Sequence, residues 1–330
     1  MSQHTDAPAS AALPSQIPLT EIEAARERIA KHVVRTPLVR FDAASSEQEI
    51  YLKLENLQPI GSFKLRGATN AILQADPAAL QDGVWTASAG NMAQGVAWCA
   101  RELGVACRVV VPDHAPAAKT EAVERLGGTI VRVPFADWWQ IIVTHSWRDA
   151  RGFFIHPVSD RNVIAGNGTI GLEIAEDLPM VDTVIVPYGG GGLSCGIASA
   201  VRSITPSARI YAVEVETAAP LAASLAAGAR VEATYTPSFV DGIGGRTVLE
   251  EMWPLARRLL AGSLVVSLRQ VADAVRLLAE RARVVAEGAG AAALAAALAG
   301  KAGPRRIVCV VSGGNIDAAK LVRILNGEIP

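Results

Sequence analysis

The sequence has no surplus of charge of either sign, since 31 lysines and arginines face 32 aspartates and glutamates. Clustered basic charge is what holds a nucleic acid or an anionic membrane surface, so the composition favours neither partner. Long hydrophobic runs are missing too. The charge-free stretch 183–201 contains Pro187 and five glycines, and the alanine-rich run 288–300 falls short of the ~20 residues that a membrane helix needs.

Cysteine is scarce, with only Cys99, Cys107, Cys195 and Cys309 in the chain. Their spacing fits neither a metal site nor a disulfide framework, which is typical of a protein in the reducing cytoplasm. Residues 1–16 lack the basic region and apolar core of a signal peptide, so we interpret them as a short disordered leader.

Lysine is also rare, with 6 residues against 25 arginines. One of them, Lys64, lies in the stretch SFKLRGA just after a turn signal. A lysine amine can lose its proton and attack a carbonyl, whereas an arginine in practice cannot. Most lysines are nevertheless solvated surface charges, and this stretch alone does not separate the two interpretations.

Short apolar segments alternate with helical patterns along the chain, and the segments are apolar on both faces, as buried parallel strands are. The predicted strands are Ile50–Glu55, Val84–Ala87, Arg108–Val111, Thr129–Val133, Thr183–Pro187, Ile210–Glu214 and Ile307–Val311. The predicted helices include Asn91–Leu103, Ala117–Leu126, Val163–Glu176, Val271–Val285 and one that starts at a capping box of Thr20 and Glu23. This alternation indicates the α/β class with a doubly wound sheet.

In such folds ligands bind beyond the carboxyl ends of the strands, so the loops after the strands are the places to examine. Thr183–Pro187 is followed by four glycines that open a helix, a turn whose backbone N–H groups suit a phosphate. Val84–Ala87 runs into the turn Ser88–Met92, which can bind a carboxylate, and Ser312 follows Ile307–Val311. Together with Lys64, these turns predict one site that holds a lysine, a phosphate-binding turn and a carboxylate-binding turn.

Two other motifs point to different enzymes, and each lacks its required context. Gly192-Leu193-Ser194-Cys195-Gly196 fits the nucleophile elbow of a hydrolase, which needs a later histidine, yet all five histidines precede Ser194. Gly288-Ala289-Gly290 resembles a dinucleotide fingerprint but follows a helical pattern rather than a strand. The hydrolase is excluded, and a dehydrogenase remains a minor alternative.

Five ordered motifs, SFKLRGA, SAGNMAQG, GGGGLSCG, EGAGA and VSGGN, resemble those of fold-type II pyridoxal-phosphate enzymes, specifically the threonine dehydratase and serine racemase group. The resemblance covers nearly all of Thr20 to Asn326. It implies two doubly wound α/β domains of the tryptophan-synthase-β-like architecture. Residues 17–80 and 157–330 would form the large cofactor-binding domain, and residues 81–156 the small one. It also implies a homodimer that binds a small amino-acid substrate.

The same resemblance implies the role of each site residue. Lys64 would hold pyridoxal 5'-phosphate as a Schiff base and, once free, would take a proton from the substrate. The other cofactor contacts would be Phe63, Asn91, Gly189, Gly190, Gly191, Gly192, Leu193 and Ser312. The substrate carboxylate would lie on Ser88, Ala89, Gly90, Asn91 and Met92. Glu287 is a further candidate beside the cofactor.

The implied activity is that of a lyase, which eliminates water from a β-hydroxy L-amino acid, threonine or serine by default, and yields a 2-oxo acid and ammonia. Met92 stands where the group usually has histidine, which leaves a bulkier or acidic substrate open, such as phenylserine or 3-hydroxyaspartate. A racemase would need a second acid/base where this chain has Ala89, whose methyl group carries no proton. A non-catalytic pyridoxal-phosphate-binding protein is the remaining alternative.

The divalent-cation site of the group would use Glu214, the Ala218 carbonyl and an acid at the position of Pro220. Proline supplies no carboxylate, and a hard cation prefers six or more oxygens. We therefore predict no metal ligands of this kind and no tight metal dependence, and a weak cation site at Glu214 stays open.

Overall fold

The structure is a computed structural model that describes residues 13–42, 48–148, 150–303 and 305–330. Most of the predicted leader, residues 1–12, lies outside the described residues. The Gln16 side chain donates hydrogen bonds to the Ser199 carbonyl at 3.0 Å and to Ser203 Oγ at 2.8 Å. The described chain is therefore held against the fold from its first residues.

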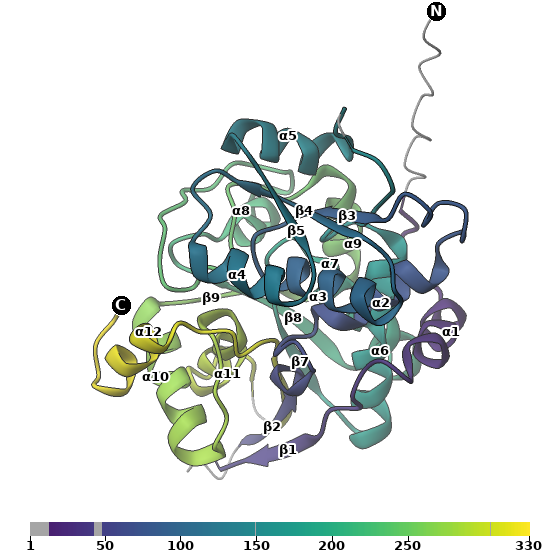
Figure 1. Cartoon of the computed structure of the whole chain (residues 1–330). Helices are drawn as coiled ribbons and strands as arrows, with labels where there is room; N and C mark the ends of the chain where they lie inside the picture. Colours follow the sequence, from purple (N-terminus) through teal and green to yellow (C-terminus); the bar gives the residue numbers. More distant parts are fainter. Residues whose placement is uncertain (1–12, 43–47, 149, 304) are drawn as a thin grey trace, which may run out of the picture.

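Two sheets form the framework (Figure 1). The larger has the strand order β1-β2-β10-β7-β8-β9 and is parallel apart from the β1–β2 pair. The smaller has the order β5-β4-β3-β6 and is parallel throughout. The strands are β1 Leu38–Phe41, β2 Gln48–Leu54, β3 Val84–Ala87, β4 Cys107–Pro112, β5 Thr129–Val133, β6 Phe153–Phe154, β7 Thr183–Pro187, β8 Arg209–Val215, β9 Gly262–Val266 and β10 Arg305–Val311.

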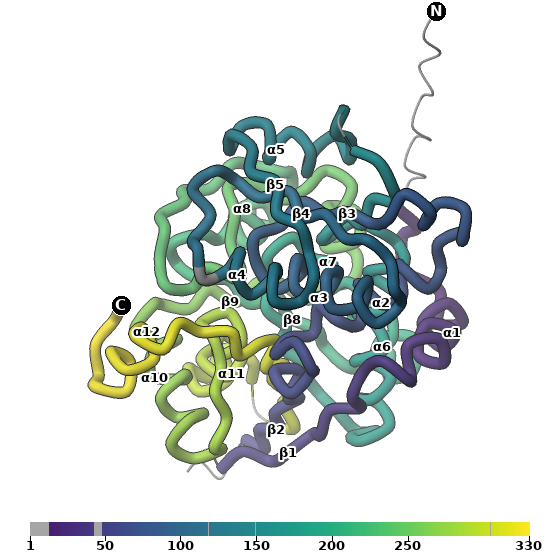
Figure 2. Tube along the Cα trace, in the orientation of Figure 1, coloured from purple at the N-terminus to yellow at the C-terminus, as the bar shows by residue number. Residues whose placement is uncertain are grey.

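Helices cover both faces of each sheet. On the larger sheet, α10 and α11 pack on one face and α1, α6, α7 and α9 on the other; on the smaller sheet, α2 and α3 pack opposite α5. Figure 2 shows α1 beside α6 and α12 beside α10, pairs that are far apart in the sequence. The helices are α1 Leu19–Ile29, α2 Lys64–Gln74, α3 Asn91–Glu102, α4 Ala117–Arg125, α5 Phe135–Thr144, α6 Arg161–Asp177, α7 Gly192–Ile204, α8 Pro220–Ala227, α9 Trp253–Leu259, α10 Leu268–Leu277, α11 Gly288–Leu298 and α12 Ala318–Leu325.

All seven predicted strands are present, with ends that differ by at most two residues from those expected. Three further strands, β1, β6 and β9, carry no long apolar run and are only partly buried, which is why the sequence did not reveal them. The predicted capping box is wrong: α1 begins after Pro18, and no side chain caps it. The predicted helix Val271–Val285 ends as a π-helical turn at Leu278–Ala282.

Helix α2, which begins at Lys64, is fixed by very close contact with α6. A Cβ on Gly67 would lie 2.8 Å from the Val163 carbonyl oxygen, and one on Gly166 would lie 2.6 Å from the Arg66 carbonyl oxygen. Only glycine permits this approach of the two backbones. The position of Lys64 is therefore set by the packing of the helix behind it.

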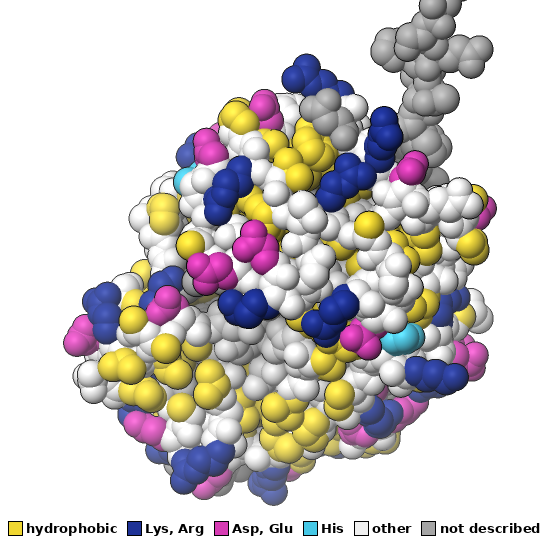
Figure 3. Space-filling model, in the orientation of Figure 1, with side chains coloured by type: hydrophobic (Ala, Val, Ile, Leu, Met, Phe, Trp, Pro, Cys, Tyr) yellow, Lys and Arg dark blue, Asp and Glu magenta, His cyan; other side chains and the backbone are white. Residues whose placement is uncertain are grey.

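The surface agrees with the balanced composition. Figure 3 shows basic and acidic side chains interspersed over the face in view, without a large area of one sign. None of the helices in the described ranges is long and apolar enough to cross a membrane.

Candidate active site

A cavity of about 340 Å³ lies at the carboxyl ends of strands from both sheets. Its walls include Pro112 at the end of β4, Pro187 at the end of β7 and Ser312 just after β10. Every site residue predicted from the sequence lines this one cavity: Phe63, Lys64, Ser88, Ala89, Gly90, Asn91, Met92, Gly189, Gly190, Gly191, Gly192, Leu193, Glu287 and Ser312.

Lys64 is the first residue of α2 and lies against the cavity, and within the described ranges it has no acidic partner. Its Nζ donates a hydrogen bond to the Pro157 carbonyl oxygen at 2.7 Å and lies 5.2 Å from the centroid of the Phe63 ring. Burial disfavours the ammonium form and lowers the pKa of Lys64 from 10.5 to about 8. A substantial fraction of the side chain is therefore a neutral amine, and hence a nucleophile, near physiological pH.

The four glycines form the turn between β7 and α7. Gly191 has φ +99°, a conformation that favours glycine, and it is the N-terminal cap of α7. A Cβ on Gly190 would lie 2.5 Å from the Val158 methyl groups, and one on Gly192 would lie 2.5 Å from the Val158 carbonyl oxygen. The turn therefore presents bare backbone at a helix N-terminus, where unpaired N–H groups and the helix dipole bind phosphate.

Asn91 opens α3 on the opposite side of the cavity, and two neighbours fix the orientation of its amide. Its Nδ2 donates to Glu287 Oε1 at 2.8 Å, and its Oδ1 accepts from Asn315 Nδ2 at 2.8 Å. Asn315 Nδ2 also donates to the Ile60 carbonyl at 2.9 Å. One N–H of Asn91 remains available to a ligand in the cavity.

Glu287 is 8 % exposed and precedes α11 at the cavity wall. Burial, reinforced by the charge of Asp241, raises the pKa of Glu287 to about 7, although the hydrogen bond from Asn91 acts in the opposite sense. The carboxyl group therefore exchanges a proton near neutral pH, a property often seen at functional sites.

Ser312 is 3 % exposed and lies between β10 and the Gly313–Gly314 turn. Its carbonyl oxygen accepts a hydrogen bond from the Phe63 backbone N–H at 3.0 Å, and Ser62 pairs with Gly313. These bonds connect the segment before Lys64 to the end of the central strand β10, so the two predicted motifs lie side by side.

Sequence reasoning missed part of the cavity wall. Phe135 and Trp138 reach it from α5, and Lys119 reaches it from α4, where its Nζ pairs with Asp241 at 3.0 Å. Trp138 packs on the smaller sheet and also lines the cavity. An α5 sequence rich in aromatic residues gives no signal that separates the two roles.

Met92 and Ala89 occupy the turn that was expected to hold a carboxylate. Met92 is 1 % exposed and belongs to the core of the smaller sheet. The Ser88 hydroxyl oxygen accepts the Gly90 N–H at 3.3 Å, so it faces its own turn. The backbone N–H groups at the start of α3 are what this turn offers to an anion.

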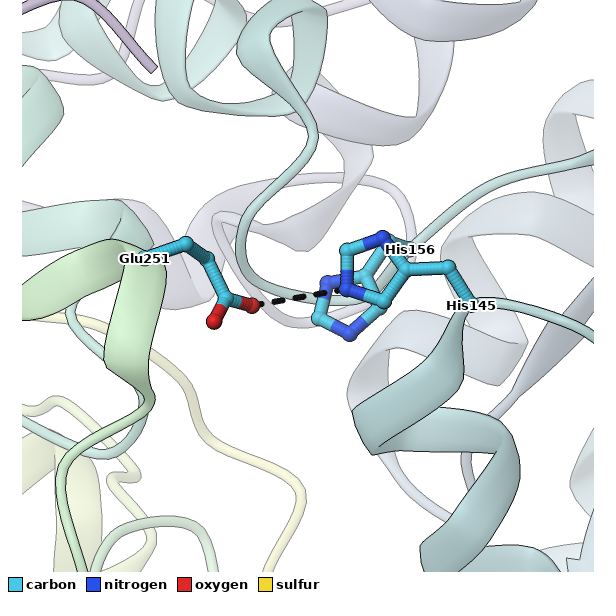
Figure 4. A group of neighbouring side chains, drawn as sticks. All are labelled: His145, His156 and Glu251. Carbon is cyan, nitrogen blue, oxygen red and sulfur yellow. Dashed lines mark ion pairs between the residues drawn. The ribbon is translucent and has the colours of Figure 1, made fainter. Parts of the chain in front are cut away.

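Among the described residues, His145, His156 and Glu251 are close enough to one another to suggest a metal site (Figure 4). His156 is unsuited to this role because both ring nitrogens already have partners: Nδ1 accepts the Ser159 N–H at 2.8 Å, and Nε2 lies 3.1 Å from the Ile142 carbonyl. The absence of a metal site remains a prediction.

The cavity fits the phosphorylated pyridine aldehyde that the sequence resemblance implies. A nucleophilic amine, an aromatic ring and a glycine turn with free N–H groups line the same space. The amine suits the aldehyde, the turn suits the phosphate, and Asn91 and Ser312 offer hydrogen-bonding groups to the ring substituents.

Comparisons with known proteins agree with this chemistry. Residues 29–313 match the family described as pyridoxal-phosphate dependent enzyme. The chain is 38 % identical to the L-threonine ammonia-lyase of Thermotoga maritima, over 94 % of this chain and 78 % of that protein. Its fold is similar to maize serine racemase, with a TM-score of 0.85 and 34 % identity over 93 % of this chain and 96 % of that one. It is also similar to a processed threonine deaminase isoform 2 from Solanum lycopersicum, with a TM-score of 0.84 and 32 % identity over 96 % of each chain.

Proposed function

The chain belongs to the family of pyridoxal-phosphate dependent enzymes, and we propose that it is an ammonia-lyase that removes water from a β-hydroxy L-amino acid. The α/β fold and the cofactor expected from the sequence are confirmed by the family match and by the solved relatives. The observation that carries the proposal is the enclosed Lys64 amine in one cavity with two anion-binding turns.

The chain's own groups divide the work. The glycine turn and Leu193 bind the phosphate through backbone N–H groups, and Phe63 packs beside the ring. The first turn of α3 binds the substrate carboxylate, which places the α-carbon near Lys64. The Lys64 amine then takes the α-proton, a step typically worth about 10²–10⁴-fold in rate.

Bound pyridoxal phosphate supplies an electron sink that weakens the bonds at the substrate α-carbon. The Ser312 hydroxyl would be a neutral partner for the ring nitrogen and would not hold a proton there as a carboxylate would. This neutral partner would favour prompt loss of the substrate β-hydroxyl. Water leaves, the released enamine takes up water, and the products are a 2-oxo acid and ammonia.

Racemisation is the second candidate, because maize serine racemase is a structural relative. It needs a proton carrier on the face opposite Lys64, and the turn there holds Ala89, beside a Ser88 hydroxyl that faces its own turn. We propose that elimination dominates. Ala89→Ser is then the single change expected to introduce racemisation.

One experiment tests the class of reaction and the substrate together. Purified holoprotein is given threonine, serine, phenylserine and 3-hydroxyaspartate, and oxo acid, ammonia and the chirality of the remaining substrate are measured. Release of oxo acid without D-amino acid supports the proposal. D-amino acid formed at a comparable rate indicates a racemase, and no turnover on any substrate indicates a non-catalytic binding protein.

The substrate within this class depends on the wall formed by Phe135, Trp138 and Met92. We propose threonine and serine first, since the chain's similarity to the ammonia-lyase extends over most of its length. The aromatic side chains of α5 favour phenylserine as the next substrate to test. A preference for 3-hydroxyaspartate would indicate that Lys119 leaves Asp241 to bind the second carboxylate.

We also propose a homodimer in the cytoplasm, with residues 17–80 and 157–330 as the large domain and 81–156 as the small one. The four strands of the smaller sheet come from residues 84–154, which supports this division. The four cysteines are free and buried, which is consistent with a reducing compartment. Sedimentation of the holoprotein tests the dimer.

A further inference from the structure

The segment from Ile155 to Asp160 connects β6 to α6, and its Val158 lines the cavity. Its Pro157 carbonyl accepts the hydrogen bond from Lys64 Nζ at 2.7 Å. Its Val158 lies so close to Gly190 and Gly192 that neither glycine tolerates a Cβ. The position of this segment therefore determines both where the free Lys64 amine lies and how the glycine turn is supported.

One side chain fixes the turn in this segment. His156 is 2 % exposed, and its Nδ1 lies 3.2 Å from the Val158 backbone N, 2.8 Å from the Ser159 backbone N and 2.8 Å from Ser159 Oγ. Backbone N–H groups can only donate, so Nδ1 is an acceptor and carries no proton. The proton is then on Nε2, which donates to the Ile142 carbonyl of α5 at 3.1 Å.

Burial keeps the His156 ring in this state. His145 stacks on it with 4.2 Å between ring centroids and pairs with Glu251 at 3.4 Å (Figure 4). Burial is the largest cause that lowers the pKa of His156 to about 3, so the ring is neutral at physiological pH. A protonated Nδ1 would be a donor facing the Val158 and Ser159 backbone N–H groups, which are also donors. Both hydrogen bonds would then be lost, and the turn would open.

We propose that His156 is a positioning residue of the active site, whose neutral ring holds residues 156–159 so that the Pro157 carbonyl places the free Lys64 amine and Val158 supports the glycine turn. This inference deepens the proposed function and rests on it. It assigns no metal, proton transfer or substrate contact to His156, which acts only through Pro157 and Val158.

The first experiment uses the apoprotein and needs neither cofactor nor substrate. An amine reagent labels Lys64 at a series of pH values, and mass spectrometry gives the labelling midpoint, expected near pH 8 in the wild type. In His156→Leu the turn loses its acceptor, water reaches the amine, and the midpoint should rise toward 10.5. His145→Asn, which leaves both hydrogen bonds of His156 in place, should keep the wild-type midpoint.

The second measurement is turnover of the holoprotein. A displacement of about 1 Å at a reacting group costs on the order of 10²-fold in rate, so His156→Leu should lower kcat by about that factor. His145→Asn should leave kcat nearly unchanged. A folded His156→Leu protein with wild-type midpoint and wild-type kcat overturns the proposal.

If His156→Leu does not fold, the variants His156→Asn and His156→Gln test the proposal instead. The asparagine Oδ1 stands where Nδ1 stands and can accept the Val158 and Ser159 N–H groups, whereas the glutamine oxygen lies one carbon farther along. The asparagine variant should keep the wild-type labelling midpoint and the glutamine variant should not. Equal midpoints in the two variants overturn the proposal. Normal labelling of a wild type that deaminates nothing would instead refute the proposed function alone.

Discussion

Helix α2 carries two buried cationic side chains, Lys64 and Arg66, whose partners differ in charge. On the cavity side, Lys64 has a neutral carbonyl as its partner, and burial lowers its pKa to about 8. Two residues later, Arg66 faces the interior and pairs with both oxygens of Glu55, at 2.8 Å each, and with Glu173 at 2.6 Å. Lys53 pairs with the same Glu173 at 2.6 Å.

The difference shows that the counter-charge decides what a buried cation does. Both side chains are desolvated, but the carboxylates outweigh desolvation at Arg66 and its pKa rises. Glu55 is affected in the same way, since Arg66 overcomes its burial and holds its pKa below the usual range. The network fixes α2, and the unpaired residue at the start of that helix is left reactive.

The largest expected effect comes from removing the Lys64 amine. Lys64→Ala removes the amine that we propose binds the aldehyde and takes the α-proton, so turnover should fall by about 10²–10⁴-fold or more. The visible absorption band of the holoprotein should disappear as well. Lys31→Ala, at an exposed lysine outside the cavity, is the matched control and should change neither. A yellow Lys64→Ala protein with full turnover would refute the assignment.

Removing the buried ion pairs of Arg66 should lower the stability of the protein. Arg66→Met leaves Glu55 and Glu173 buried without their guanidinium, which should lower the free energy of unfolding by about 3–5 kcal/mol. Urea denaturation measures the loss. Arg161→Met removes the exposed pair with Glu21 and should cost at most about 1 kcal/mol. Similar losses in the two variants would mean that burial of the network does not matter.

The comparison is tested most directly by a substitution on the same helix that should raise, rather than lower, the free energy of unfolding. The pKa of Lys64 is lower in the folded protein than its ordinary value, so the unfolded chain binds more protons between about pH 8 and 10.5, and apoprotein stability rises there with pH. Lys64→Met removes this penalty and should stabilise the apoprotein at pH 7 by about 1–3 kcal/mol.

The gain should disappear above the ordinary lysine pKa of 10.5. Urea denaturation of the wild type and of Lys64→Met at a series of pH values measures the difference. Lys64→Met that is less stable than the wild type at pH 7 would show that Lys64 has a compensating partner.

The smallest expected effect concerns another buried carboxyl group, that of Glu214. Its two oxygens accept the Leu221 and Ala222 backbone N–H groups at 2.9 and 2.8 Å and the Ser263 hydroxyl at 2.6 Å, so N–H and O–H donors satisfy the carboxyl without a cation. A chelator should therefore leave turnover unchanged. Activity that is lost with the chelator and restored by magnesium would contradict this expectation.

Buried parallel strands could be predicted because their apolar runs are continuous, and the cavity could be predicted because its turns carry glycine, serine and asparagine at strand ends. The segment from Ile155 to Asp160 could not be predicted as part of the site. Pro157 contacts Lys64 through its backbone carbonyl, and Val158 contacts the glycine turn through its apolar side chain. Backbone carbonyls and apolar side chains occur throughout the chain, so no sequence motif identifies them. The partner of Asn91 could not be predicted either, because Glu287 lies 196 positions away in the sequence.

The lowered pKa of Lys64 also has a chemical cost for the chain. The neutral fraction of this amine condenses with any small aldehyde or reactive ketone that enters the cavity. Under the proposed function, pyridoxal phosphate would bind this amine and so would also act as a protecting group. Newly made protein is therefore most vulnerable to carbonyl damage before it acquires the cofactor.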